Sequence, residues 1–137
     1  MKTSRFFASR RLALGSMASL LLGAWAVPVA AQSTWPDRPI KVVVPYAAGQ
    51  GADVLMRLLG NELSKSLNQS IVIENRAGAG ANIGTAYVAK SAPDGYTFLL
   101  GTNATHAANE FLYPNPGFSP TADFDGVAMI GLLPMVI

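Results

Sequence analysis

The chain has 137 residues, of which half are hydrophobic and 13% are charged, a composition that excludes a disordered chain and suits one small domain. The absence of cysteine excludes disulfides, cysteine metal sites and cysteine nucleophiles. The formal charge of +2 comes from four basic residues near the start. Without them, six basic residues face eight acidic ones, which gives no case for nucleic acid or an anionic membrane as a partner.

The first 31 residues have the pattern of a secretory signal peptide. Residues 1–11 are basic, residues 12–26 are apolar, and small residues precede a cleavage point between Ala31 and Gln32. The apolar run is about 15 residues, shorter than the ~20 that span a membrane. We expect cleavage there and export to the periplasm. The paired arginines Arg10 and Arg11 leave both the general and the twin-arginine export routes open.

The mature chain alternates strand-like and helix-like segments. Apolar runs at residues 40–46, 71–74 and 97–100 predict buried strands, and residues 127–137 predict a fourth. Helices are predicted at residues 53–67, 83–90 and 104–112. The first is expected to pack through leucines 55, 58, 59, 63 and 67, and the second through Ile83, Ala86 and Tyr87. This alternation is typical of an α/β fold with a parallel sheet.

Three loops follow the predicted strands, at residues 46–53, 75–84 and 102–109. In a parallel sheet these loops share the carboxyl edge, where ligands bind in open α/β folds. The first combines two glycines with a helix start, whose unpaired N–H groups and dipole favour a carboxylate or phosphate. The three loops together offer backbone N–H groups, hydroxyls and amides. This set suits the reversible binding of a small anion rather than bond breaking.

Catalytic and cofactor motifs are weak. Gly49-x-Gly51 lacks the third glycine of a dinucleotide loop, there is no P-loop lysine, and no serine has a nucleophile-elbow context. His106 is the only histidine, which excludes a histidine cluster for a metal. We expect it to be a hydrogen-bonded residue near a helix start or part of a polar pocket wall. The sequence predicts no catalytic residue, no metal and no cofactor.

Two charged residues leave alternatives open. Asp53 either caps the first helix or accepts a hydrogen bond from a ligand hydroxyl, ammonium or bridging water, because it would repel a bare carboxylate. Arg76 either clamps its own loop or pairs with a ligand carboxylate. The structural role is favoured for Arg76.

Five motifs follow one another along the chain. They are Trp35-Pro-Asp-Arg-Pro-Ile40, Val44-Pro-Tyr-Ala-Ala-Gly49 with Asp53, Glu74-Asn-Arg-Ala-Gly-Ala-Gly80 with Asn82-Ile-Gly84, Pro93-Asp-Gly-Tyr-Thr97, and Gly101-Thr-Asn-Ala-Thr-His-Ala-Ala-Asn109. In this order they resemble the periplasmic receptors of tripartite tricarboxylate transporters, the Bug-type solute-binding proteins. The resemblance implies a two-domain Venus-flytrap fold of the periplasmic-binding-protein type. It also implies a small carboxylate in the cleft, held by loop backbone groups and ordered waters for delivery to a membrane transporter.

The resemblance places the ligand site in the same three loops. The predicted ligand-binding residues are Tyr46, Ala48, Gly49, Gly51, Asp53, Gly78, Gly80, Ala81, Asn82, Thr102, Asn103, Thr105 and His106. Gln50 and Ala81 stand where the family usually has glycine, so the identity of the carboxylate stays open.

The resemblance also sets expectations for domains and partners. Such receptors run to roughly twice this length or more, as two domains require. We therefore expect residues 32–137 to be most of the first domain of a truncated receptor, and the isolated chain to bind ligand poorly. The expected partners of this monomer are a small carboxylate and the membrane component of a tripartite tricarboxylate transporter.

Two readings compete with the receptor. An exported α/β hydrolase-like enzyme would need a serine, a histidine and an aspartate within reach of one another. A structural or docking protein would show no saturable binding of small molecules.

Overall fold

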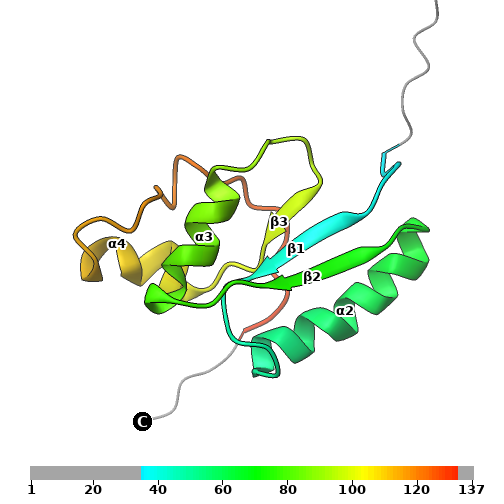
Figure 1. Ribbon diagram of the computed structural model, residues 1–137, viewed down its shortest axis with the longest axis horizontal. Helices are drawn as coiled ribbons and strands as arrows, with labels where there is room; N and C mark the ends of the chain where they lie inside the picture. Colours follow the sequence, from blue (N-terminus) through cyan, green and yellow to red (C-terminus); the bar gives the residue numbers. More distant parts are fainter. Residues whose placement is uncertain (1–34, 133–137) are drawn as a thin grey trace, which may run out of the picture. The chain divides into compact units, whose positions relative to one another are not determined.

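The computed structural model describes residues 35–132, so the predicted signal peptide lies outside the described residues. The described part contains strands β1 (Ile40–Val44), β2 (Ile71–Asn75) and β3 (Thr97–Leu99), and helices α2 (Gly51–Leu67), α3 (Asn82–Ala89) and α4 (Asn109–Leu112) (Figure 1). A 3₁₀ turn, η1 (Ala79–Ala81), leads into α3, and a π-helical turn, η2 (Ala104–Ala108), leads into α4. None of these helices is long and apolar enough to cross a membrane.

The strands form a parallel sheet in the order β2–β1–β3. In register, Val42 of β1 lies between Ile73 of β2 and Phe98 of β3. All positions of β1 except Lys41 are buried, as expected for a near-continuous β-branched run in a strand that is covered on both faces. The predicted α/β parallel sheet is therefore confirmed.

Side chains of β1 alternate between two differently covered faces. Val42 and Val44 pack with Met56 of α2 and with Leu100, and Ile71, Ile73 and Phe98 join the same cluster. Lys41 points the other way, where its ammonium donates a 3.1 Å hydrogen bond to the Tyr87 hydroxyl of α3. Helices α2 and α3 therefore cover opposite faces of the sheet, as Figure 1 shows.

The buried stripe of α2 only partly follows its leucines. Met56 and Gly60 are buried, and Leu59 and Leu63 pack against the core. Leu55 and Leu58 remain 41% and 64% exposed, so their predicted core role is wrong. Both lie rotated away from the stripe that the helical period carries through positions 56, 60 and 63.

Helix α3 packs through the predicted Ala86 and Tyr87, which are half-buried, but not through the predicted Ile83. Ile83 is 53% exposed, whereas Gly84 and Thr85 are buried. A Cβ on Gly84 would lie 2.7 Å from the carbonyl oxygen of Arg76 and 3.0 Å from the Pro45 ring. The close approach of helix to sheet selects the glycine face, which the apolar pattern does not reveal.

The predicted fourth strand is wrong where it can be checked. Residues 127–132 form no strand, and Val127 and Leu132 are 78% and 82% exposed. No described strand pairs with this segment, and an unpaired strand is not stable by itself. Residues 133–137 lie outside the described residues.

Candidate functional site

The three predicted site loops meet at the carboxyl edge of the sheet. With strand order β2–β1–β3, the loops after β1 and β3 are neighbours. In doubly wound sheets, the point where successive connections leave in opposite directions is where ligands bind. A 2.7 Å hydrogen bond between the Tyr46 hydroxyl and Thr102 Oγ1 bridges these two loops. The site is therefore centred on two hydroxyls that come from opposite sides of this point.

The first loop exposes its backbone. Ala48, Gly49, Gln50 and Gly51 are exposed, and Gly49 has a φ of 84° that suits a residue without a side chain. Among the described residues, the N–H groups of Ala47 and Ala48 have no hydrogen-bond acceptor. They lie just before the N-terminus of α2, where the helix dipole favours an anion.

Asp53 is buried beneath this loop. Its side chain is 3% exposed, and its Oδ2 accepts hydrogen bonds from the Gly49 N–H at 2.8 Å and from Arg57 Nε at 2.9 Å. Its Oδ1 accepts from Asn75 Nδ2 at 2.9 Å. Arg57 above all, with Gly49 and Asn75, lowers the pKa of Asp53 to about 2. The predicted capping role is wrong, because Gln50 is the N-cap of α2 and makes no side-chain capping bond.

The second loop winds through left-handed backbone. Gly78, Ala79, Gly80 and Ala81 have φ values of 131°, 48°, 62° and 79°. Such values are costly for the two alanines and are usually kept where the surrounding structure imposes them. Asn109 supplies that support, since its Nδ2 donates to the Gly80 carbonyl at 2.8 Å and to Asn82 Oδ1 at 2.6 Å.

The third loop is fixed by hydroxyl contacts. Thr105 Oγ1 accepts from the Thr102 N–H at 2.9 Å and lies 2.8 Å from His106 Nδ1. The His106 ring packs edge-on against Phe124 at 5.0 Å between centroids, and burial lowers the pKa of the histidine. His106 is therefore a hydrogen-bonded residue near a helix start, as one of the sequence alternatives expects.

Arg76 contacts strand β2 and helix α3 and is not available to bind a ligand. Its Nε donates to Glu74 Oε1, and its guanidinium carbon lies 3.6 Å from the centroid of the Tyr87 ring. These contacts bear out the favoured structural role. Within residues 35–132, no three histidine, aspartate or glutamate side chains gather as a metal site would require.

The thirteen predicted site residues fall into two groups by exposure. Asp53, Ala81, Asn82 and Thr105 are buried and make internal contacts. The others are exposed or half-buried along the loops: Tyr46, Ala48, Gly49, Gly51, Gly78, Gly80, Thr102, Asn103 and His106. Sequence reasoning missed the supporting roles of Arg57, Asn75 and Asn109. The i, i+4 spacing of Asp53 and Arg57 on one helix is the signal that could have identified Arg57 from the sequence.

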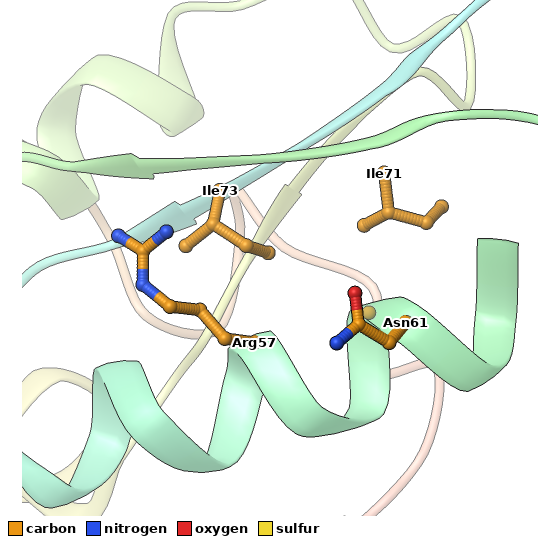
Figure 2. Close-up of a pocket in the computed structure, with 5 residues that line it drawn as sticks. Arg57, Asn61, Ile71 and Ile73 are labelled. Atoms are coloured by element: carbon orange, nitrogen blue, oxygen red, sulfur yellow. The ribbon is translucent and has the colours of Figure 1, made fainter.

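A separate hollow of about 260 Å³ lies between α2 and β2 (Figure 2). Arg57, Gly60 and Asn61 of α2 and Ile71 and Ile73 of β2 line it. None of the thirteen predicted residues belongs to this lining. Gly60 lies close to the isoleucines, since a Cβ there would be 3.4 Å from Ile71 Cγ2 and 3.5 Å from Ile73 Cδ1, and the hollow is distinct from the loop site.

The first and fourth sequence motifs meet at the opposite, amino edge of the sheet. The Tyr96 hydroxyl donates to Asp37 Oδ1 at 2.6 Å, and Arg38 pairs with Asp94 at 2.9 Å. Trp35 Nε1 donates to the Gly95 carbonyl at 3.2 Å. We call these six residues the amino-edge clasp. It fastens the segment before β1 to the turn before β3 and contributes nothing to the loop site.

Comparison with known proteins shows similarity to one group. Residues 55–137 match the tripartite tricarboxylate transporter family receptor. The chain is 44% identical over 113 residues to protein BugT of Bordetella pertussis, covering 82% of this chain. It is also similar to the structure of MatC from Rhodopseudomonas palustris with bound malate, with 42% identity, a TM-score of 0.63 and 66% of this chain covered. A second R. palustris protein, solved with adipate, has 45% identity and a TM-score of 0.61 over 63% of this chain.

The chain spans about a third of the length of these relatives. It covers 34% of BugT, 31% of MatC and 29% of the adipate-bound protein. The fold similarity therefore concerns one part of a longer architecture.

Proposed function

Because this chain belongs to the tripartite tricarboxylate transporter receptor family, we propose that it is part of a periplasmic solute-binding receptor that holds a small carboxylate at the carboxyl edge of the sheet. The family is one of receptors, so the prediction of a non-catalytic protein is confirmed and the hydrolase alternative is wrong.

The observation that carries the proposal is the paired arrangement of the first and third loops. The Tyr46 and Thr102 hydroxyls meet there, beside the exposed N–H groups of Ala47 and Ala48. Hydroxyls and backbone N–H groups are neutral donors that bind a carboxylate and still release it, as a receptor must. The one carboxylate beneath them, Asp53, is already paired with Arg57.

The ligand class that fits best is a small dicarboxylate. The solved relatives with malate and adipate support this choice, since both acids carry a carboxylate at each end. In our proposal, the first carboxylate lies against the Tyr46 loop. The second carboxylate of the acid binds groups that lie outside the described residues.

The remaining features of the receptor follow as part of the same proposal. Residues 1–31 act as a cleaved signal peptide, and residues 32–137 form the first domain that faces the ligand. The receptor works as a monomer and delivers its acid to the membrane component of a transporter.

The test is thermal unfolding in the presence of malate, adipate and citrate. It compares this chain with the longest natural reading frame that contains it. A ligand at ~100 times its dissociation constant stabilises a binder by about 2.7 kcal/mol. We expect a shift of the longer form with at least one acid and a smaller shift of this chain. The absence of any shift in both folded forms would contradict the carboxylate-receptor proposal.

A further inference from the structure

Three polar side chains lock the first loop to the elements beneath it. They are Asp53 and Arg57 of α2 and Asn75 of β2, and we call them the loop clamp. Arg57 donates to Asp53 Oδ2 at 2.9 Å and to Asn75 Oδ1 at 3.0 Å. Asn75 Nδ2 donates to Asp53 Oδ1 at 2.9 Å and to the Tyr46 carbonyl at 3.2 Å. The three side chains therefore form a closed ring that also grips the backbone at Tyr46.

The ring and burial together keep Asp53 from contacting a ligand, because its side chain is only 3% exposed. Its carboxylate already accepts three hydrogen bonds, and one of them takes the Gly49 N–H. That N–H therefore points inward, away from the exposed surface of the loop. The same contacts fix where the neighbouring N–H groups point, because a four-residue loop that is held at both ends has little freedom.

The clamp also solves an electrostatic problem. A buried carboxylate lies directly under the loop to which an anion is proposed to bind, and like charges repel at short range. Arg57 supplies the opposing charge at 2.9 Å, with half of its side chain in solvent. Together the two residues carry no net charge beneath the loop. Without Arg57, the site would contain an unpaired negative charge.

We propose, as an extension of the function proposed above, that Arg57 is a positioning residue that neutralises Asp53 so that the first loop accepts an anion. Arg57 touches no ligand in this account. It acts through Asp53 and Asn75, and the sign of the charge left in the clamp sets the affinity for the acid.

Charge and geometry are separated by four variants. Arg57→Lys keeps the positive charge but loses the two-pronged contact, whereas Arg57→Met loses both. Asp53→Asn keeps the shape and leaves Arg57 unopposed. The double variant Arg57→Met/Asp53→Asn is neutral again. Arg38→Met is the matched control, because it removes an arginine from an ion pair of the same length at the amino edge.

The measurement is calorimetric titration with malate and adipate of the longest natural reading frame that contains this sequence. We expect Arg57→Met to weaken binding by roughly threefold to tenfold, the size of a nearby unit charge in a solvated setting. Arg57→Lys and Arg38→Met should stay within about twofold of wild type. Asp53→Asn should bind as tightly as wild type or more tightly, and the double variant should recover most of the loss.

A purely structural clamp gives a different pattern. Arg57→Lys, Arg57→Met and Asp53→Asn would then all weaken binding, and the double variant would bind worst. That result would overturn the inference while leaving the receptor proposal intact. Equal binding by all variants would also overturn it. A folded wild type that binds neither acid nor citrate would contradict the receptor proposal itself, and the inference with it.

Discussion

The two edges of the sheet use polar residues in opposite ways. At the amino edge, the clasp residues satisfy one another: Tyr96 with Asp37, Arg38 with Asp94, and Trp35 with the Gly95 carbonyl. At the carboxyl edge, buried side chains bind the loops from beneath and leave backbone donors exposed above. The first arrangement closes the fold, and the second presents a surface.

The difference shows that a shared motif does not by itself mark a ligand site. Both edges carry sequence motifs of the family, and both contain aspartate, arginine and glycine. The distinction lies in which groups remain unpaired once the side chains have found partners. At the carboxyl edge, within the described part of the chain, these include the Ala47 and Ala48 N–H groups of the first loop, which no side-chain pattern reports directly.

The largest expected effect is a loss of stability when the packing at the carboxyl edge is disrupted. Gly84→Ala should lower the free energy of unfolding by about 1–3 kcal/mol, since its Cβ would meet the Arg76 carbonyl oxygen at 2.7 Å. Urea unfolding measures this loss. Gly126→Ala is the control, because a Cβ there meets nothing within 4 Å. Equal stability of the Gly84 variant and wild type would mean that α3 does not approach Pro45 so closely.

The second effect is a pH dependence that belongs to the carboxyl edge. The pKa of Asp53 lies at about 2 in the folded chain, below the value of about 4 for an unfolded aspartate. Its ionised form therefore stabilises the fold above pH 4, and this contribution is lost as the pH falls through 2.

The free energy of unfolding, measured in urea between pH 6 and pH 2, should fall more steeply for wild type than for Asp53→Asn. Arg38→Met should keep the wild-type slope, because its ion pair is exposed at the other edge. Parallel slopes for wild type and Asp53→Asn would contradict the clamp geometry.

A smaller effect tests the bridge between the first and third loops. Tyr46→Phe and Thr102→Val each remove one partner of the 2.7 Å hydroxyl contact, and each should cost about 0.5–1.5 kcal/mol. The double variant should cost less than the sum of the two, since both remove the same bond. Strict additivity in a double-mutant cycle would show that the two loops are not joined there.

The smallest effect relieves strain in the second loop. Ala81 has a φ of 79°, which costs an alanine about 1–2 kcal/mol more than a glycine. Ala81→Gly should raise stability by about 0.5 kcal/mol, because the greater freedom of glycine in the unfolded chain offsets part of the relief. Ala86→Gly, within α3, should instead lower stability. A loss in both variants would indicate that the Ala81 side chain contributes packing that outweighs its strain.

The sequence predicted the repeating pattern of the fold but not its packing faces. The run at residues 40–44 is buried at every position except Lys41, and its composition alone predicted a buried strand. Leu55 and Leu58 were wrongly assigned to the core because their spacing is helical. Which face of the helix meets the sheet depends instead on the contacts of Met56 and Gly60. The predicted strand from Val127 failed because pairing partners are a property of the fold and not of a segment.

The candidate site was predicted in position more than in detail. The loops were placed correctly at one edge, since parallel strands determine that. The buried roles of Asn82 and Thr105 could not be predicted, because each depends on a contact with a specific partner, Asn109 or His106. Asp53 was ambiguous for the same reason, as its partner Asn75 is distant in sequence.

The most direct test of the account is a heteronuclear NMR titration with malate and adipate, using the longest natural reading frame that contains this sequence. The account predicts saturable shifts of the amides of Ala47, Ala48, Gly80, Thr102 and Asn103. The amides of Arg38, Asp94 and Tyr96 at the amino-edge clasp should stay in place. Saturable shifts centred on the clasp, with the three loops unchanged, would contradict the central claim that the carboxyl edge is the ligand surface.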